Sequence, residues 1–126
     1  MFQVIFNEIS AAEISQLDTL AQLELLDEFQ VSPDDLESFD KGDEDAPFGM
    51  IEREGKTLYR YRAQDLRIYF EVTDTNEAII VHRVLNRNTF TDFLFRATNL
   101  SMEDAALGES KHFWELIDEG VKAPRV

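Results

Sequence analysis

The sequence predicts an α+β domain in which a helical hairpin packs on a small, mainly antiparallel sheet. Two observations predict this class. Helical patterns dominate the first forty residues, whereas residues 57–85 contain three segments rich in β-branched and aromatic side chains. Strands that follow one another with short connections form an antiparallel meander. The length of 126 residues fits one domain with one core.

The N-terminal part is expected to contain a strand and a long helix. Residues 2–6 suit a short strand that is partly buried on both faces. Ser10 can cap the helix that follows, and Glu13 stands at the position that completes a capping box. Apolar residues recur at helical spacing over residues 14–29, which predicts one continuous helix ending near Gln30.

A second, shorter helix is predicted after Ser32, because Pro33 occupies the first helical position and two acids follow it. The acidic stretch 40–47 contains Gly and Pro and is expected to be a loop. Strands are predicted over residues 57–63, 66–73 and 78–85, joined by a tight turn at 64–65 and a polar turn at 74–77.

Three further helical segments are predicted beyond the strands, over residues 89–97, 100–107 and 110–119, followed by a frayed tail at 121–126. The chain then divides into two parts. Residues 1–98 have the order β-α-α-β-β-β-α, and residues 99–126 form a C-terminal helical extension that packs on this domain or trails from it.

The composition indicates a soluble cytoplasmic protein. The chain has no Cys, which excludes disulfides, thiolate metal sites and a cysteine nucleophile, and fits a reducing compartment. We expect no signal peptide, because the N-terminus lacks a basic region and a long apolar core. No apolar run approaches the ~20 residues that a membrane helix needs, so no membrane partner is expected.

The net charge of −14 describes the first part of the chain and not the middle. Residues 1–50 contain thirteen acids and one base, Lys41, whereas residues 51–100 contain seven acids and eight bases, seven of them Arg. A basic footprint is what a nucleic-acid partner requires. The Arg-rich middle third is therefore where a phosphate-binding site is sought.

The segment 58–72, with the sequence LYRYRAQDLRIYFEV, resembles the central hairpin of the RelE/ParE toxin superfamily. That family typically has a Tyr, alternating basic residues, a short turn and then an Arg-apolar-apolar-aromatic strand. Residues 78–87 resemble the strand that follows and its exit. The resemblance covers residues 2–6 and 58–96 best, and it implies the β-α-α-β-β-β-α fold.

Members that resemble RelE cut messenger RNA on the ribosome without a metal, and their basic side chains orient and stabilise the reacting phosphate. Arg suits this task, because its planar guanidinium grips phosphate oxygens bidentately. The resemblance implies no cofactor, an antitoxin protein as partner, and the ribosome with its mRNA as target. The implied catalytic set is Arg60, Arg62, Arg67 and Arg87, and the implied RNA-binding set is Arg83, Phe93 and Arg96.

Two alternatives stay open. Phe93 stands where RNA-cleaving members near the RelE type carry a Tyr, and a phenyl ring cannot transfer a proton. Beside the favoured function, a RelE-like toxin that acts on ribosome-bound mRNA, the chain could be a non-catalytic interaction protein on the same scaffold, using its acidic first half, or a ParE-like toxin directed at gyrase. The plainer interpretation of the arginines is that they pair with the many acids. His82 is interpreted as a packed or half-exposed strand residue, and no acidic cluster has the spacing of a calcium loop.

Overall fold

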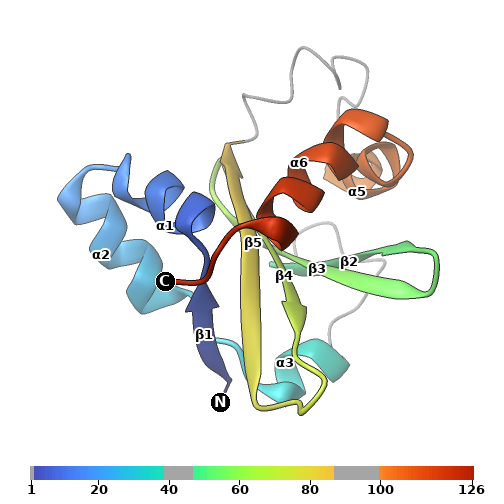
Figure 1. Cartoon of the computed structure of the whole chain (residues 1–126). Helices are drawn as coiled ribbons and strands as arrows, with labels where there is room; N and C mark the ends of the chain where they lie inside the picture. Colours follow the sequence, from blue (N-terminus) through green and yellow to red (C-terminus); the bar gives the residue numbers. More distant parts are fainter. Residues whose placement is uncertain (1, 39–46, 87–99) are drawn as a thin grey trace.

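The computed structural model describes residues 2–38, 47–86 and 100–126. Within them the chain forms one five-stranded mixed sheet with helices on both faces, which confirms the α+β class (Figure 1). The predicted loop at 40–47, apart from Pro47, and the predicted helix at 89–97 lie outside these residues. None of the described helices is long and apolar enough to span a membrane.

The sheet has the order β1-β5-β4-β3-β2. Three of its four strand pairs are antiparallel, and β1 runs parallel to β5. Because the antiparallel strands follow one another along the chain, they need only short turns. The strands are β1 (Gln3–Phe6), β2 (Phe48–Arg53), β3 (Lys56–Ala63), β4 (Leu66–Val72) and β5 (Ala78–Asn86).

The meander β3-β4-β5 confirms the three predicted strands, but the edge strand β2 was not predicted. Its residues include Gly49, and it ends in the charged residues Glu52 and Arg53, so the β pattern is weak. The signal that could have revealed it is the dipeptide Glu54-Gly55. Both residues have positive φ, 52° and 81°, and they join β2 to β3 as a two-residue hairpin with Arg53 paired to Lys56.

The prediction of one helix from Ser10 to Gln30 is wrong, because the chain forms two helices there. Helix α1 (Glu8–Ser15) begins at Asn7, whose side chain accepts from the backbone N–H of Ser10 at 2.7 Å. Helix α2 (Thr19–Glu28) begins anew at Asp18, whose carboxylate accepts from the N–H of Ala21 at 2.8 Å. An Asp that caps a new helix competes with continuation of the previous one. Helix α3 (Pro33–Ser38) confirms the second predicted helix.

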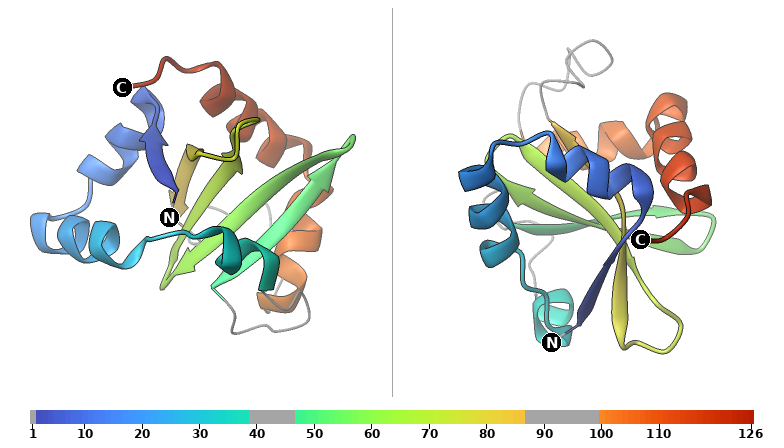
Figure 2. Two further views of the ribbon diagram at one scale, coloured as in Figure 1. Left: turned by 90° about the horizontal axis from the view of Figure 1, so that it is seen from below. Right: turned by 60° about the vertical axis from the view of Figure 1, so that its left-hand side comes forward.

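The first face of the sheet packs against α1, α2 and the segment that leads to α3. Figure 2 shows this helical group and the C-terminal helices on opposite sides of the sheet. We call the core between these helices and the sheet the hairpin-side core, after the helical hairpin. It is rich in aromatic rings that contact one another edge to face or tilted, such as Phe29 and Phe70, whose ring centroids are 5.7 Å apart. Its buried members include Phe2, Ile14, Leu25, Phe29, Val31, Phe48, Tyr61, Ile68, Phe70, Ile79, Val81 and Val84.

The second face of the sheet is covered by α5 (Leu100–Gly108) and α6 (Lys111–Lys122). Because helices lie on both sides, β4 and β5 are buried almost continuously instead of in alternation. The second-face core consists of Ile51, Leu58, Tyr69, Leu85, Leu107, Phe113 and Ile117. Helices α5 and α6 therefore complete a second hydrophobic core, on the face of the sheet opposite the first core.

The predicted frayed tail is also wrong, because the last residues are tied to the start of the fold. The N–H of Val126 donates to the carbonyl of Phe6 at 3.0 Å, and that of Glu8 donates to the carbonyl of Pro124 at 2.8 Å. Buried Asn7 adds a side-chain link, donating to the carbonyls of His82 at 3.1 Å and Gly120 at 2.8 Å. This amide joins β1, β5 and α6 at one point.

Candidate functional site

Three of the predicted arginines lie together on the second face of the sheet. Arg60 and Arg62 are two apart on β3, so their side chains leave the same face. Arg67 of β4 is directly opposite Arg62 in the antiparallel pair and shares that face. The arginine face, as we call the surface formed by Arg60, Arg62 and Arg67, is therefore a consequence of strand alternation and register.

Arg60 is held by an acid from α5. Its Nη2 lies 2.8 Å from Oδ2 of Asp104 and its Nε 3.3 Å from Oδ1, so the pair is bidentate. A third donor, Nη1, reaches the carbonyl of Pro47 at 2.8 Å. Gly49 is opposite Arg60 on β2, and a Cβ there would lie 2.7 Å from Cζ of Arg60. The absence of a side chain at this position gives the guanidinium its space.

Arg67 is more deeply enclosed. Its Nε donates to Oε2 of Glu103 at 2.8 Å, and its Nη1 donates to the carbonyls of Gln64 at 2.6 Å and Leu66 at 3.0 Å. The side chains of Arg67 and Glu103 are 1% and 4% exposed. Such a pair is desolvated, and each charge depends on the other. Adjacent residues of α5 thus supply one carboxylate to each of two arginines.

Burial and the nearby charges shift the pKa values of two further groups on this face, the guanidinium of Arg62 and the hydroxyl of Tyr69. Burial lowers the pKa of the half-buried Arg62, and the positive charges of Arg60 and Arg67 lower it further. Burial raises the pKa of Tyr69 well above its usual value, and the charges of Glu103 and Asp104 raise it as well. The Tyr69 hydroxyl is buried and has no hydrogen-bond partner among the described residues.

Two members of the implied catalytic set are not open to solvent, as a site that binds RNA directly would require. Arg60 is 4% exposed and Arg67 1% exposed, because α5 lies over them. The plainer interpretation, pairing with acids, holds for both. Arg87, which was to complete the catalytic set, and the RNA-binding candidates Phe93 and Arg96 lie outside the described residues.

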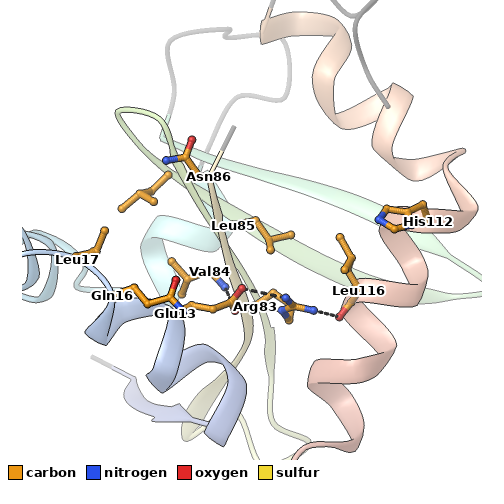
Figure 3. Close-up of a pocket in the computed structure, with 10 residues that line it drawn as sticks. Glu13, Gln16, Leu17, Arg83, Val84, Leu85, Asn86, His112 and Leu116 are labelled. Atoms are coloured by element: carbon orange, nitrogen blue, oxygen red, sulfur yellow. Dashed lines mark hydrogen bonds and ion pairs between the residues drawn. The ribbon is translucent and has the colours of Figure 1, made fainter. Parts of the chain in front are cut away.

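Arg83, the remaining RNA-binding candidate, is tied up between α1 and α6. Figure 3 shows its guanidinium between Glu13 and Leu116. Two of its nitrogens donate to the Glu13 carboxylate at 3.1 and 3.0 Å, and Nη1 donates to the carbonyl of Leu116 at 3.0 Å and to Glu119 at 3.2 Å. Glu13 also accepts from the N–H of Val84 at 3.0 Å. Arg83 therefore clamps the two helical groups to β5.

A pocket of about 450 Å³ opens beside this clamp, at the C-terminal end of β5. Gln16 and Leu17 line it from the α1 side, and His112 and Leu116 line it from α6 (Figure 3). The one charge pair in its described lining, Arg83 with Glu13, is internally satisfied. The described residues of the pocket lining therefore offer no concentrated positive charge for a phosphate group.

His82 is buried, which agrees with its interpretation as a packed strand residue. Its Nε2 lies 3.2 Å from a carboxylate oxygen of Glu71 on the neighbouring strand. This contact with His82 lowers the pKa of Glu71 below its usual range. Among the described residues, no group of three or more His, Asp or Glu side chains is placed to hold a metal ion.

Glu103 and Asp104 are the site residues that the sequence reasoning missed. A signal was present, since Glu103 is one helical turn before Leu107 and therefore shares the apolar side of a helix. An acid in that position must be paired when the helix packs on a sheet.

No protein-family model matches this sequence, and no curated protein matches it either.

Proposed function

We propose that the chain is a RelE-like member of the RelE/ParE superfamily that binds RNA phosphates with the arginine face. In this proposal α5 covers the face in the closed form of the protein and leaves it when RNA binds. The observation that carries the proposal is the match of charges: two adjacent carboxylates of α5 sit on two arginines of the sheet, in the way that successive phosphates would.

The bidentate contact of Arg60 with Asp104 supports this proposal, because the same fork geometry fits a phosphate. The unpaired hydroxyl of Tyr69 supports it too. A buried hydroxyl without a partner costs about 1–3 kcal/mol, and an RNA phosphate at the arginine face would give it an acceptor. In the proposed site, the hydroxyl of Tyr69 would therefore donate a hydrogen bond to the phosphate without adding a positive charge.

The proposed chemistry is electrostatic. Arginines stay charged and are poor proton donors or acceptors, so Arg60, Arg62 and Arg67 would orient a phosphate and stabilise charge that grows on it. In RNA cleavage of the RelE type, the 2′-oxygen of the RNA bonds to the adjacent phosphorus and the bond from phosphorus to the 5′-oxygen breaks, which leaves a 2′,3′-cyclic phosphate and a free 5′-hydroxyl without a metal. Because arginines are poor proton donors and acceptors, water would take the proton from the 2′-hydroxyl and supply one to the departing 5′-oxygen. Binding without cleavage remains within the same proposal, since the arginine face alone supplies affinity.

The variant that tests this function is Arg62→Gln. Arg62 is only half-buried, so we expect Gln to be tolerated at this position, whereas removal of Arg67 would strand a buried acid. We expect single-stranded RNA to bind Arg62→Gln more weakly, with the slope of log affinity against log salt reduced by about 0.7, the value for one phosphate contact. Fluorescence anisotropy with a labelled RNA measures both quantities.

The matched control is Lys56→Gln, which removes one positive charge from the same face of the same strand, at its exposed end. This control should retain the salt slope of the unmodified chain. Equal RNA binding by the two variants would remove the arginine face from the proposal. Induced expression with assays of messenger cleavage and gyrase supercoiling then separates RelE-like from ParE-like activity.

A second candidate function, a non-catalytic interaction protein on the same scaffold, is favoured by one observation. Residues 2–38 contain nine acids and no Lys or Arg, and α2 carries exposed leucines. This function predicts neither RNA binding nor gyrase inhibition. It also predicts a basic protein partner for the acidic surface.

A further inference from the structure

Helix α2 presents large apolar side chains to solvent. Leu20 is 65% exposed, Leu23 62% and Leu26 45%. They recur at three-residue spacing and so lie along one side of the helix. Glu24 and Asp27 are exposed on the same outward side. We call the surface formed by these five residues the outer face of α2.

The core contact of α2 is made by residues outside the outer face. Leu25, on the opposite side of the helix, is buried in the hairpin-side core, and Phe29 continues that contact just after the helix ends. A surface helix normally directs its leucines to the core and polar residues to solvent. Helix α2 instead has one buried and three exposed leucines, so an apolar surface remains for another molecule.

The negative charge of residues 2–38 indicates which kind of partner the outer face of α2 would bind. All nine ionisable side chains of residues 2–38 are acids. Glu24 and Asp27 form no ion pair with any residue in the described part of the chain. An acidic partner or a nucleic acid would be repelled here, and so would a second copy of the chain, because it would bring the same acids to the contact.

We propose that the outer face of α2 binds a basic amphipathic helix of another protein. The ten residues of α2 span about 15 Å, so the partner contributes about three turns with apolar side chains at i, i+3, i+4 and i+7. Lys or Arg residues beside this stripe meet Glu24 and Asp27. The surface lies on the hairpin side of the sheet, away from α5, so this inference is independent of the RNA-binding proposal (Figure 1).

The apolar contact and the charges have different tasks in this proposal. The leucines supply affinity by losing contact with water. The acids select a basic partner and speed its approach, with a range set by the ~8 Å Debye length at physiological salt. Binding should therefore weaken with added salt but persist in part when the charges are screened.

The test uses the whole chain and a synthetic Leu/Lys peptide that forms an amphipathic helix, with a Leu/Glu peptide of the same pattern as the opposite-charge probe. We expect the Leu/Lys peptide to bind and to shift backbone amide NMR signals of α2, with no binding of the Leu/Glu peptide. Leu20→Gln with Leu23→Gln should weaken binding by about tenfold or more, because two side chains no longer lose apolar contact with water.

Charge variants complete the experiment. Glu24→Gln with Asp27→Asn should weaken binding several-fold at physiological salt, whereas Glu8→Gln with Glu37→Gln, which neutralises two exposed acids outside α2, should change it less than about twofold. Both leucine and charge variants alter exposed side chains, so the fold is retained. Binding that the leucine variant leaves unchanged, NMR shifts outside α2, or self-association of the chain in ultracentrifugation would each overturn the proposal.

Discussion

Replacing Glu103 by Ala is expected to lower the free energy of unfolding by about 3–5 kcal/mol, the usual result of removing one partner of a buried ion pair. The substitution leaves Arg67, which is 1% exposed, without its carboxylate in a site that excludes water. Urea denaturation followed by circular dichroism measures the change. A loss this large would make α5 part of the cooperative fold in the absence of RNA.

Two controls isolate the cause. Asp118→Ala breaks the pair that Asp118 forms with Arg53 at 2.8 Å, but these side chains are 43% and 36% exposed, so the expected loss is about 0–1 kcal/mol. The double variant Arg67→Met with Glu103→Leu replaces the buried charges by apolar groups and should recover most of the stability. An equal loss for Glu103→Ala and Asp118→Ala would contradict the buried arrangement.

Gly120→Ala is expected to destabilise the protein by about 1–3 kcal/mol or more, the range for overpacked contacts. An added Cβ would collide with the backbone carbonyl of His82, because α6 crosses β5 at this point. The carbonyl cannot move away, since it also accepts from the Asn7 side chain. We expect α6 to shift outward and Trp114 fluorescence to change, which thermal unfolding and emission spectra measure.

Gly108→Ala is the matched control for this effect. It lies in α5 and an added Cβ would approach only a side-chain methyl, Cγ2 of Ile51, at 3.2 Å. A small side-chain adjustment relieves such a contact, and Ala favours the helix by roughly 0.5–1 kcal/mol over Gly. Gly108→Ala should therefore be near neutral. A loss of stability as large as that of Gly120→Ala would show that the helix crossing is not the cause.

The antiparallel meander could be predicted because its strands are rich in β-branched and aromatic residues and its turns are short. The side of the sheet shared by Arg60 and Arg62 followed from alternation alone. Strand β2 escaped because Gly49 and polar residues weaken its pattern. The helix break at Asp18 escaped because the leucines that continue the periodicity, such as Leu20, face solvent instead of the core.

The burial of Arg60 and Arg67 and their pairing with acids could not be predicted, because these contacts join residues that are far apart in the sequence. Arg67 and Glu103 are 36 residues apart, and Arg60 and Asp104 are 44 apart. Periodicity places an acid on the inner side of α5 but does not say which cation it meets. Local patterns thus predict where side chains leave a strand, and tertiary packing decides whether water or RNA can reach them.

The proposed RNA binding requires α5 to leave the arginine face, and a reversible lock tests this requirement most directly. Ile51→Cys with Gly108→Cys would place two thiols within disulfide distance between β2 and α5, in a chain that has no other Cys. Oxidation then fixes α5 on the sheet, and reduction releases it. Each single-Cys variant controls for the substitutions themselves.

RNA binding by the two redox forms is the deciding measurement. We predict that the reduced protein binds single-stranded RNA at low salt and that the oxidised protein binds at least about tenfold more weakly, since a locked cover removes the binding-competent state. Equal affinity of both forms would mean that RNA, if bound, uses another surface. Absence of binding in both forms would leave Glu103 and Asp104 as purely structural partners of the arginines.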